Sequence, residues 1–289
     1  MSTIFEAERT DARTQLKRHK LELAKACKKI LDTYEGRITS RQIFYQLLSG
    51  GLVCNTENAY KKVCKVIREA RRIGLIDWPD IEGCRCQIKT SRLFTGPDDL
   101  VEVALSSFDM DRWVYQPERV AVVCQKEELS AVIQPVCQRW QVPFVATRGY
   151  PSASLVAEAA VRLAGHRLLY YCDLDPEGLI IGRRWQAQLD SFAAGACVQR
   201  LALDFMQVEH FNLPPRPVKL TDARATTYQR EHGDSCWELE ALPPQFLQSF
   251  VESDIRDHID RRAWEIREDE IEDARHALRV SLKGNDHAS

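Results

Sequence analysis

The sequence lacks the features that mark membrane and secreted proteins. None of its apolar runs approaches the roughly 18 residues that a membrane-spanning helix needs. Residues 1–10, MSTIFEAERT, contain no basic segment followed by an apolar one, so no secretory signal is visible. These absences predict a cytoplasmic protein with no membrane partner.

Common metal and nucleotide motifs are also missing. The 10 cysteines include no CxxC pair and the 7 histidines no HExxH, so reduced cysteines are expected rather than zinc or disulfides. No GxxxxGK[ST] loop is present. An ATPase of that kind working with this chain would therefore be a separate subunit.

An acidic pair follows an apolar segment in the middle of the chain. Residues 168–172 have the length and composition of a buried strand, and Asp173-Leu174-Asp175 comes next. Residues two apart on a strand project to the same face, so both carboxylates leave the strand end together. Such a pair is typical of a Mg²⁺ site, with Mn²⁺ as the other candidate. In the alternative interpretation, the two aspartates only cap the helix that Pro176 begins.

Strand and helix patterns alternate around this pair. Strands are expected at 118–125, 142–147, 168–172 and 198–205, and helices at 126–140, 152–163 and after 176. This order predicts an α/β domain over 110–250, with a parallel sheet covered by helices. Chemistry gathers at the carboxyl ends of such strands, which places Gln125 near Asp173 and Asp175.

The N-terminal part is basic and helical. Residues 1–80 carry 16 Lys and Arg against 10 Asp and Glu, whereas residues 252–289 carry 7 against 11. Three helical patterns predict a winged-helix (helix-turn-helix) domain over 1–95, with 74–90 as the wing. The chain should end in a charged helical extension over 251–289. The third helical pattern, 57–73, has a basic face formed by Lys61, Lys62, Lys65, Arg68 and Arg72. This face predicts contact with duplex DNA phosphates; the alternative is an ordinary solvated face.

Several motifs together resemble a known family. A strand that ends at a glutamate position, followed later by a strand that ends in Asp-x-Asp, is similar to the Toprim fold of topoisomerases, primases and nucleases. Over residues 15–250 the chain resembles a compact bacterial branch related to the A subunit of topoisomerase VI and to the meiotic double-strand-break proteins. The strings that carry this resemblance are ITSRQIFY (38–45), QKEEL (125–129), RGYPS (148–152), DLDPEG (173–178) and WELEALPP (237–244).

The resemblance implies an enzyme that cleaves DNA with Mg²⁺ or Mn²⁺. Cutting both strands takes two copies, so a homodimer is expected. Asp173, Asp175 and position 125 would supply the metal carboxylates, and Tyr45 would attack the DNA phosphate with help from Arg41. In the alternative, Tyr45 packs within its domain and a metal-bound water hydrolyses DNA, as in a nuclease of phage defence. RNA as the substrate also stays open.

One position departs from the family pattern. The family has glutamate where this chain has Gln125, which keeps the shape and loses the charge. The change is explained by engineered inactivation, by natural inactivation, or by compensation from Glu127 or Glu128. The intact neighbouring motifs favour the first. Natural inactivation would make the chain a DNA-binding or regulatory protein without catalysis.

Two further residues are candidates for a supporting role. Glu238 or Glu240, in the WELEALPP string, is expected to approach the metal site, and Arg148 is expected to touch a phosphate. For Glu238 a structural turn before a helix is the alternative interpretation.

Overall fold

The computed structural model describes residues 18–34, 37–77, 81–82, 93–218 and 225–283. The chain divides into two compact units. One combines Met1–Gly83 with Val120–Asp254, and the other combines Cys84–Arg119 with Ile255–Ser289. Within the described ranges, no helix has the length and apolar character to cross a membrane.

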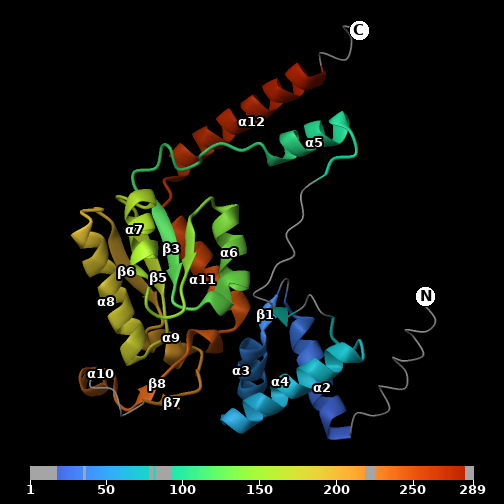
Figure 1. Ribbon diagram of the computed structural model, residues 1–289, viewed down its shortest axis with the longest axis vertical. Coiled ribbons are helices and arrows are strands. Elements are labelled where there is room, and N and C mark those ends of the chain that lie inside the picture. Colours follow the sequence, from blue (N-terminus) through green and yellow to red (C-terminus); the bar gives the residue numbers. More distant parts are fainter. Residues whose placement is uncertain (1–17, 35–36, 78–80, 83–92, 219–224, 284–289) are drawn as a thin grey trace, which may run out of the picture. The chain divides into compact units, whose positions relative to one another are not determined.

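A parallel sheet of four strands lies at the centre of the larger unit (Figure 1). Its order is β4 (Phe144–Ala146), β3 (Val120–Cys124), β5 (Arg167–Tyr171) and β6 (Cys197–Ala202), and every neighbouring pair is parallel. The central strands β3 and β5 are almost continuously apolar because both of their faces are buried. The predicted α/β class and parallel sheet are confirmed.

Two helices pack on one face of the sheet. They are α7 (Ala153–Arg162) and α8 (Pro176–Ser191), which follow β4 and β5 in the chain. Alternate strand residues face these helices, as the twofold period of a strand requires. The shared core includes Ala121, Val123, Val156, Ala159, Leu168, Tyr170, Ile181 and Trp185.

The other face is covered by α6 (Ser130–Arg139) and α11 (Pro244–Arg256), which Figure 1 shows on the opposite side of the strands from α8. Tyr171, next to Tyr170 on β5, points to this face and donates a hydrogen bond of 2.5 Å from its hydroxyl to Asp254. Helices on both faces leave the carboxyl ends of the strands as the place where polar groups gather.

The N-terminal helices pack against one another. They are α2 (Arg18–Leu31), α3 (Ser40–Ser49) and α4 (Glu57–Arg72). Thr39 forms a capping box with Gln42 at the start of α3, and Thr56 caps α4. The short strand β1 (Ile38–Thr39) pairs in parallel with β2 (Ile81–Glu82). Much of the predicted wing, namely residues 78–80 and 83–90, lies outside the described residues.

Short elements after β6 lead the chain back to the carboxyl ends of the strands. They are α9 (Phe205–His210), β7 (Arg216–Pro217), α10 (Ala225–His232), β8 (Ser235–Cys236) and η3 (Leu239–Ala241). Leu174 and Trp237 exchange backbone hydrogen bonds of 2.9 and 3.0 Å. This bridge places the WELEALPP segment beside Asp173 and Asp175.

The described part of the second unit contains two helices and the loop that leads from the first of them to β3. Its helices are α5 (Pro97–Ser107) and α12 (Arg261–Lys283). Trp113 packs edge-on against Trp264 with ring centroids 5.9 Å apart. The Asp260 backbone N–H donates to the Gln116 side chain at 2.7 Å.

Gly182 of α8 provides a test of the packing between this helix and β5. A Cβ at Gly182 would lie 2.9 Å from the buried ring of Tyr170. Gly182→Ala should therefore lower the free energy of unfolding by about 1–3 kcal/mol, because overpacking outweighs the better helix propensity of alanine. Urea denaturation measures the difference.

Gly50→Ala is the matched control. A Cβ at Gly50 meets only Gln46 and Leu47 carbonyl oxygens at 3.4 and 3.7 Å, and its φ is −78°. Equal stability of the two variants would contradict the predicted clash.

Candidate functional site

A cavity of about 440 Å³ lies where β3 and β5 end. Its lining brings together parts of the chain that are far apart in sequence. The charged residues around it are Arg41, Lys126, Asp173, Asp175, Glu177, Arg216 and Glu238. The structure therefore places the predicted acidic pair and Arg41 at one site and adds two cations, Lys126 and Arg216, that the sequence interpretation missed.

The two aspartates of the Asp-x-Asp string have different partners. Asp173 is 6% exposed, accepts a hydrogen bond of 2.8 Å from the Leu239 N–H, and binds Lys126 Nζ at 3.0 Å. Asp175 caps α8 by accepting from the Gly178 N–H at 2.6 Å. Burial and the charge of Asp173 raise the pKa of Asp175 to about 6. Asp175 thus acts as a cap and also belongs to a site with surplus negative potential.

Gln125 fits tightly between β3, β5 and the start of α8. Its Oε1 accepts from the Asp173 backbone N–H at 3.1 Å. A Cβ on Gly178 would lie 2.9 Å from that oxygen and 2.5 Å from the Asp173 carbonyl. Glycine is therefore required where α8 approaches the strand ends, and the side chain at position 125 is held at the site by the backbone of β5.

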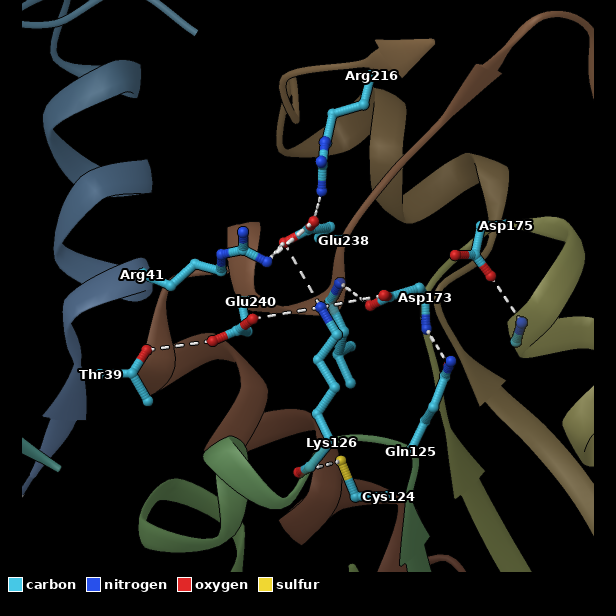
Figure 2. A network of polar contacts seen from close by, with 12 residues as sticks. Thr39, Arg41, Cys124, Gln125, Lys126, Asp173, Asp175, Arg216, Glu238 and Glu240 are labelled. Carbon is cyan, nitrogen blue, oxygen red and sulfur yellow. Dashed lines mark hydrogen bonds and ion pairs between the residues drawn. The ribbon is translucent and has the colours of Figure 1, made fainter. Parts of the chain in front are cut away.

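Lys126 places a positive charge among the carboxylates (Figure 2). Its Nζ lies 3.0 Å from Asp173, 3.5 Å from Glu238 and 3.2 Å from Glu240. Burial lowers the pKa of Lys126, but Asp173 and Glu240 outweigh this effect and raise the pKa above its ordinary value. The ammonium group is therefore a permanent internal cation of the site. The only sequence signal for it is a lysine directly after a strand end.

Glu238 is the most strongly paired carboxylate of the site. Besides Lys126 it binds Arg41 Nη1 at 3.1 Å and Arg216, and Figure 2 shows it between the two guanidinium groups. Its side chain is 9% exposed. Glu240 accepts a hydrogen bond of 3.2 Å from the Thr39 hydroxyl. These contacts join the start of α3 to the η3 segment.

Tyr45 lies on α3 and is 3% exposed. Its ring packs edge-on against Phe44, with centroids 5.6 Å apart. Burial raises the pKa of Tyr45, whereas the charges of Arg216, Arg41 and Lys126 act to lower it. The phenol is thus within electrostatic range of the cavity cations, but burial keeps it in the neutral, weakly nucleophilic form.

The other predicted site residues lie elsewhere. Arg148 pairs with Glu127 at the surface, with side chains 47% and 48% exposed, and neither lines the cavity. Glu127 thus has no place in the carboxylate cluster. The basic face of α4, formed by Lys61, Lys62, Lys65, Arg68 and Arg72, is exposed along its length.

The residues fit a magnesium ion only if two carboxylates are its protein ligands. Over the part of the chain that the structure describes, no three His, Cys, Asp or Glu side chains are arranged to hold a metal. Magnesium can, however, be held by one or two carboxylates together with water and substrate phosphate. Asp173 and Asp175 provide that pair. Burial and the charge of Asp173 raise the pKa of Asp175, and a bound cation would offset both effects.

Comparison with known proteins does not add a family to this description. No protein-family model matches the sequence, and no curated protein is significantly similar to it. The interpretation of the cavity therefore depends on its own residues.

The raised pKa of Asp175 predicts a pH dependence of stability. In the metal-free protein, a carboxyl whose pKa rises from 3.8 to about 6 on folding binds its proton more tightly when folded. Its contribution is therefore fully present below pH 3.8 and is lost as the pH rises through about 6.

Asp175→Asn removes this titration and keeps a capping oxygen. Relative to the variant, the unsubstituted protein should lose up to about 3 kcal/mol of unfolding free energy between about pH 4 and pH 7. Urea titrations in EDTA across this range measure it. A difference that does not change with pH would contradict the assignment.

Proposed function

We propose that this chain is a Mg²⁺-dependent DNA-cleaving enzyme of the Toprim type, similar to the A subunit of topoisomerase VI. The observation that carries the proposal is the cavity at the strand ends, where the Asp173 and Asp175 carboxylates lie beside Lys126, Arg41 and Arg216. Carboxylates that can hold a divalent cation and side chains that can bind a phosphate are two features that support phosphodiester cleavage by a nucleophile.

The N-terminal helices support the same proposal. The exposed basic face of α4 suits the phosphates of duplex DNA, and three packed helices suit a helix-turn-helix or winged-helix domain. Arg41, at the start of α3, lines the cavity and forms an ion pair with Glu238. The same small domain would thus bind the duplex and contribute to the site. A homodimer is proposed because two strands require two sites.

In this proposal Asp173, Asp175 and Arg41 have separate roles. Asp173 and Asp175 would hold the ion, which when bound would stabilise negative charge on the phosphate. Asp175 holds the start of α8 at the same time, so the cation site and the helix are positioned together. Arg41 would stabilise charge on the phosphate as it develops.

A second candidate is a DNA-binding protein that does not cleave. Gln125 favours it, because the amide removes one carboxylate from the site. Lys126 also favours it, since its ammonium group already forms ion pairs with Asp173, Glu238 and Glu240. In this candidate the cavity would act as a structural centre and the α4 face as the DNA contact.

Gln125→Glu separates the two candidates. The side chain at 125 is held against the Asp173 N–H, and a carboxylate can accept the same hydrogen bond. The added charge should allow plasmid nicking or linearisation with Mg²⁺ or Mn²⁺. The metal should also raise the melting temperature of the variant more than that of the unsubstituted protein.

The control is Gln125→Glu combined with Asp175→Asn, which should bind metal weakly and leave plasmid intact. If Gln125→Glu neither cuts DNA nor gains a metal-dependent melting shift, the enzyme proposal is wrong. Retained duplex binding would then leave the binding protein as the function.

The burial of Tyr45 predicts hydrolysis rather than covalent cleavage. In the Gln125→Glu background, Tyr45→Phe should keep plasmid cleavage within a few-fold, because the hydroxyl is buried and neutral. Denaturing gels should show no protein joined to end-labelled DNA in either form. A covalent adduct that disappears in Tyr45→Phe would establish the tyrosine as the nucleophile.

A further inference from the structure

Three cations converge on one buried carboxylate at the cavity. Glu238 binds Arg41, Arg216 and Lys126, and its side chain is 9% exposed. Lys126 also serves Asp173 and Glu240, but the described contacts of Arg216 at this site go to Glu238 alone. One carboxylate thus binds two guanidinium groups and an ammonium group at the same time.

The position of this carboxylate is important because it faces the cavity. Lys126, Asp173, Asp175, Arg216 and Glu238 line the same space. Arginine presents a planar fork of donors that matches a phosphate, and lysine adds a point charge. A phosphate in this place would meet the same donors that now bind Glu238.

We infer that Lys126 and Arg216 hold a nucleic-acid phosphate, and that Glu238 occupies their donors when no nucleic acid is bound. The inference rests on the proposed function, because it concerns the same cavity and deepens its substrate contacts. The phosphate would take over the donors of Arg216 and Lys126, and the Glu238 side chain would turn away. No covalent bond is made or broken in this exchange.

The exposure of the partners fits such an exchange. The Arg216 side chain is 40% exposed, whereas that of Lys126 is 15% exposed. Arg216 therefore reaches from the surface strand β7, and Lys126 lies deeper. The backbone next to Glu238 is anchored to β5 by the hydrogen bonds between Leu174 and Trp237. The proposed exchange would therefore turn the Glu238 side chain and leave this backbone in place.

A purely structural role for the cluster makes a different prediction. If Glu238 only joins α3, β7 and Lys126, removing any member should lower stability and leave nucleic-acid affinity unchanged. If Glu238 competes with phosphate, removing its charge should lower stability and raise affinity. The two effects of one substitution then have opposite signs.

The experiment measures binding of a fluorescently labelled short DNA duplex by anisotropy, in EDTA and over a range of salt concentrations. Arg216→Ala should weaken binding about tenfold and reduce the slope of log K against log salt by about one. Glu238→Gln should bind more tightly than the unsubstituted protein and melt at a lower temperature. The control Arg162→Ala, on α7 and paired with Glu158 at the surface, should change neither affinity nor slope.

Circular dichroism confirms that each variant is folded. If Arg216→Ala or Glu238→Gln does not fold, Arg216→Lys provides the test. This variant keeps the positive charge and loses the planar donors of the guanidinium group. It should therefore keep the salt slope and bind DNA with an intermediate affinity. Unchanged affinity in a folded Arg216 variant, or weaker binding by a folded Glu238→Gln, overturns the inference.

The result is separable from the proposed function. Metal-dependent cleavage by Gln125→Glu together with unchanged duplex binding by Arg216→Ala would overturn only the phosphate site. If the unsubstituted protein binds no duplex and Gln125→Glu cuts none, both proposals fail.

Discussion

The rest of the site depends on the ion pairs that the ammonium group of Lys126 forms with carboxylates. Lys126 lies two residues after β3 and binds Asp173, two residues after β5, and both glutamates of the 237–240 segment. Buried carboxylates at this distance from one another would repel, and each would be costly to bury without a partner. With the lysine in place, three separate segments meet in one cluster. The segments that this cluster joins also line the cavity.

The same cluster reaches the N-terminal helices. Glu240 accepts from the Thr39 hydroxyl, and Glu238 binds Arg41. Thr39, which caps α3, and Arg41 in its first turn therefore contact the site at the ends of the sheet strands. In the proposed function this connection is useful, because the domain that would bind DNA is coupled directly to the carboxylates that would hold the ion.

Much of the fold follows from local patterns in the sequence. The strands around 120–124 and 167–171 were predictable because buried parallel strands are continuous apolar runs, and the start of α8 was predictable from Asp175 and Pro176. The gathering of Asp173, Asp175 and Gln125 also followed, because parallel strands place their carboxyl ends at one edge. Glu127 and Arg148 were placed near the site by their proximity in sequence to it, but their side chains turn to each other.

The sequence by itself determined the class of the fold, the acidic pair at the strand end and the basic face of α4, since each depends on residues that are neighbours in the chain. The tertiary structure alone decided that Lys126 neutralises the carboxylates, that Arg216 meets Glu238, and that Tyr45 is buried. The first two facts depend on contacts between residues 22 to 114 positions apart. The third depends on what packs around α3. Side-chain direction at such contacts is set by packing and charge together, and no local pattern encodes it.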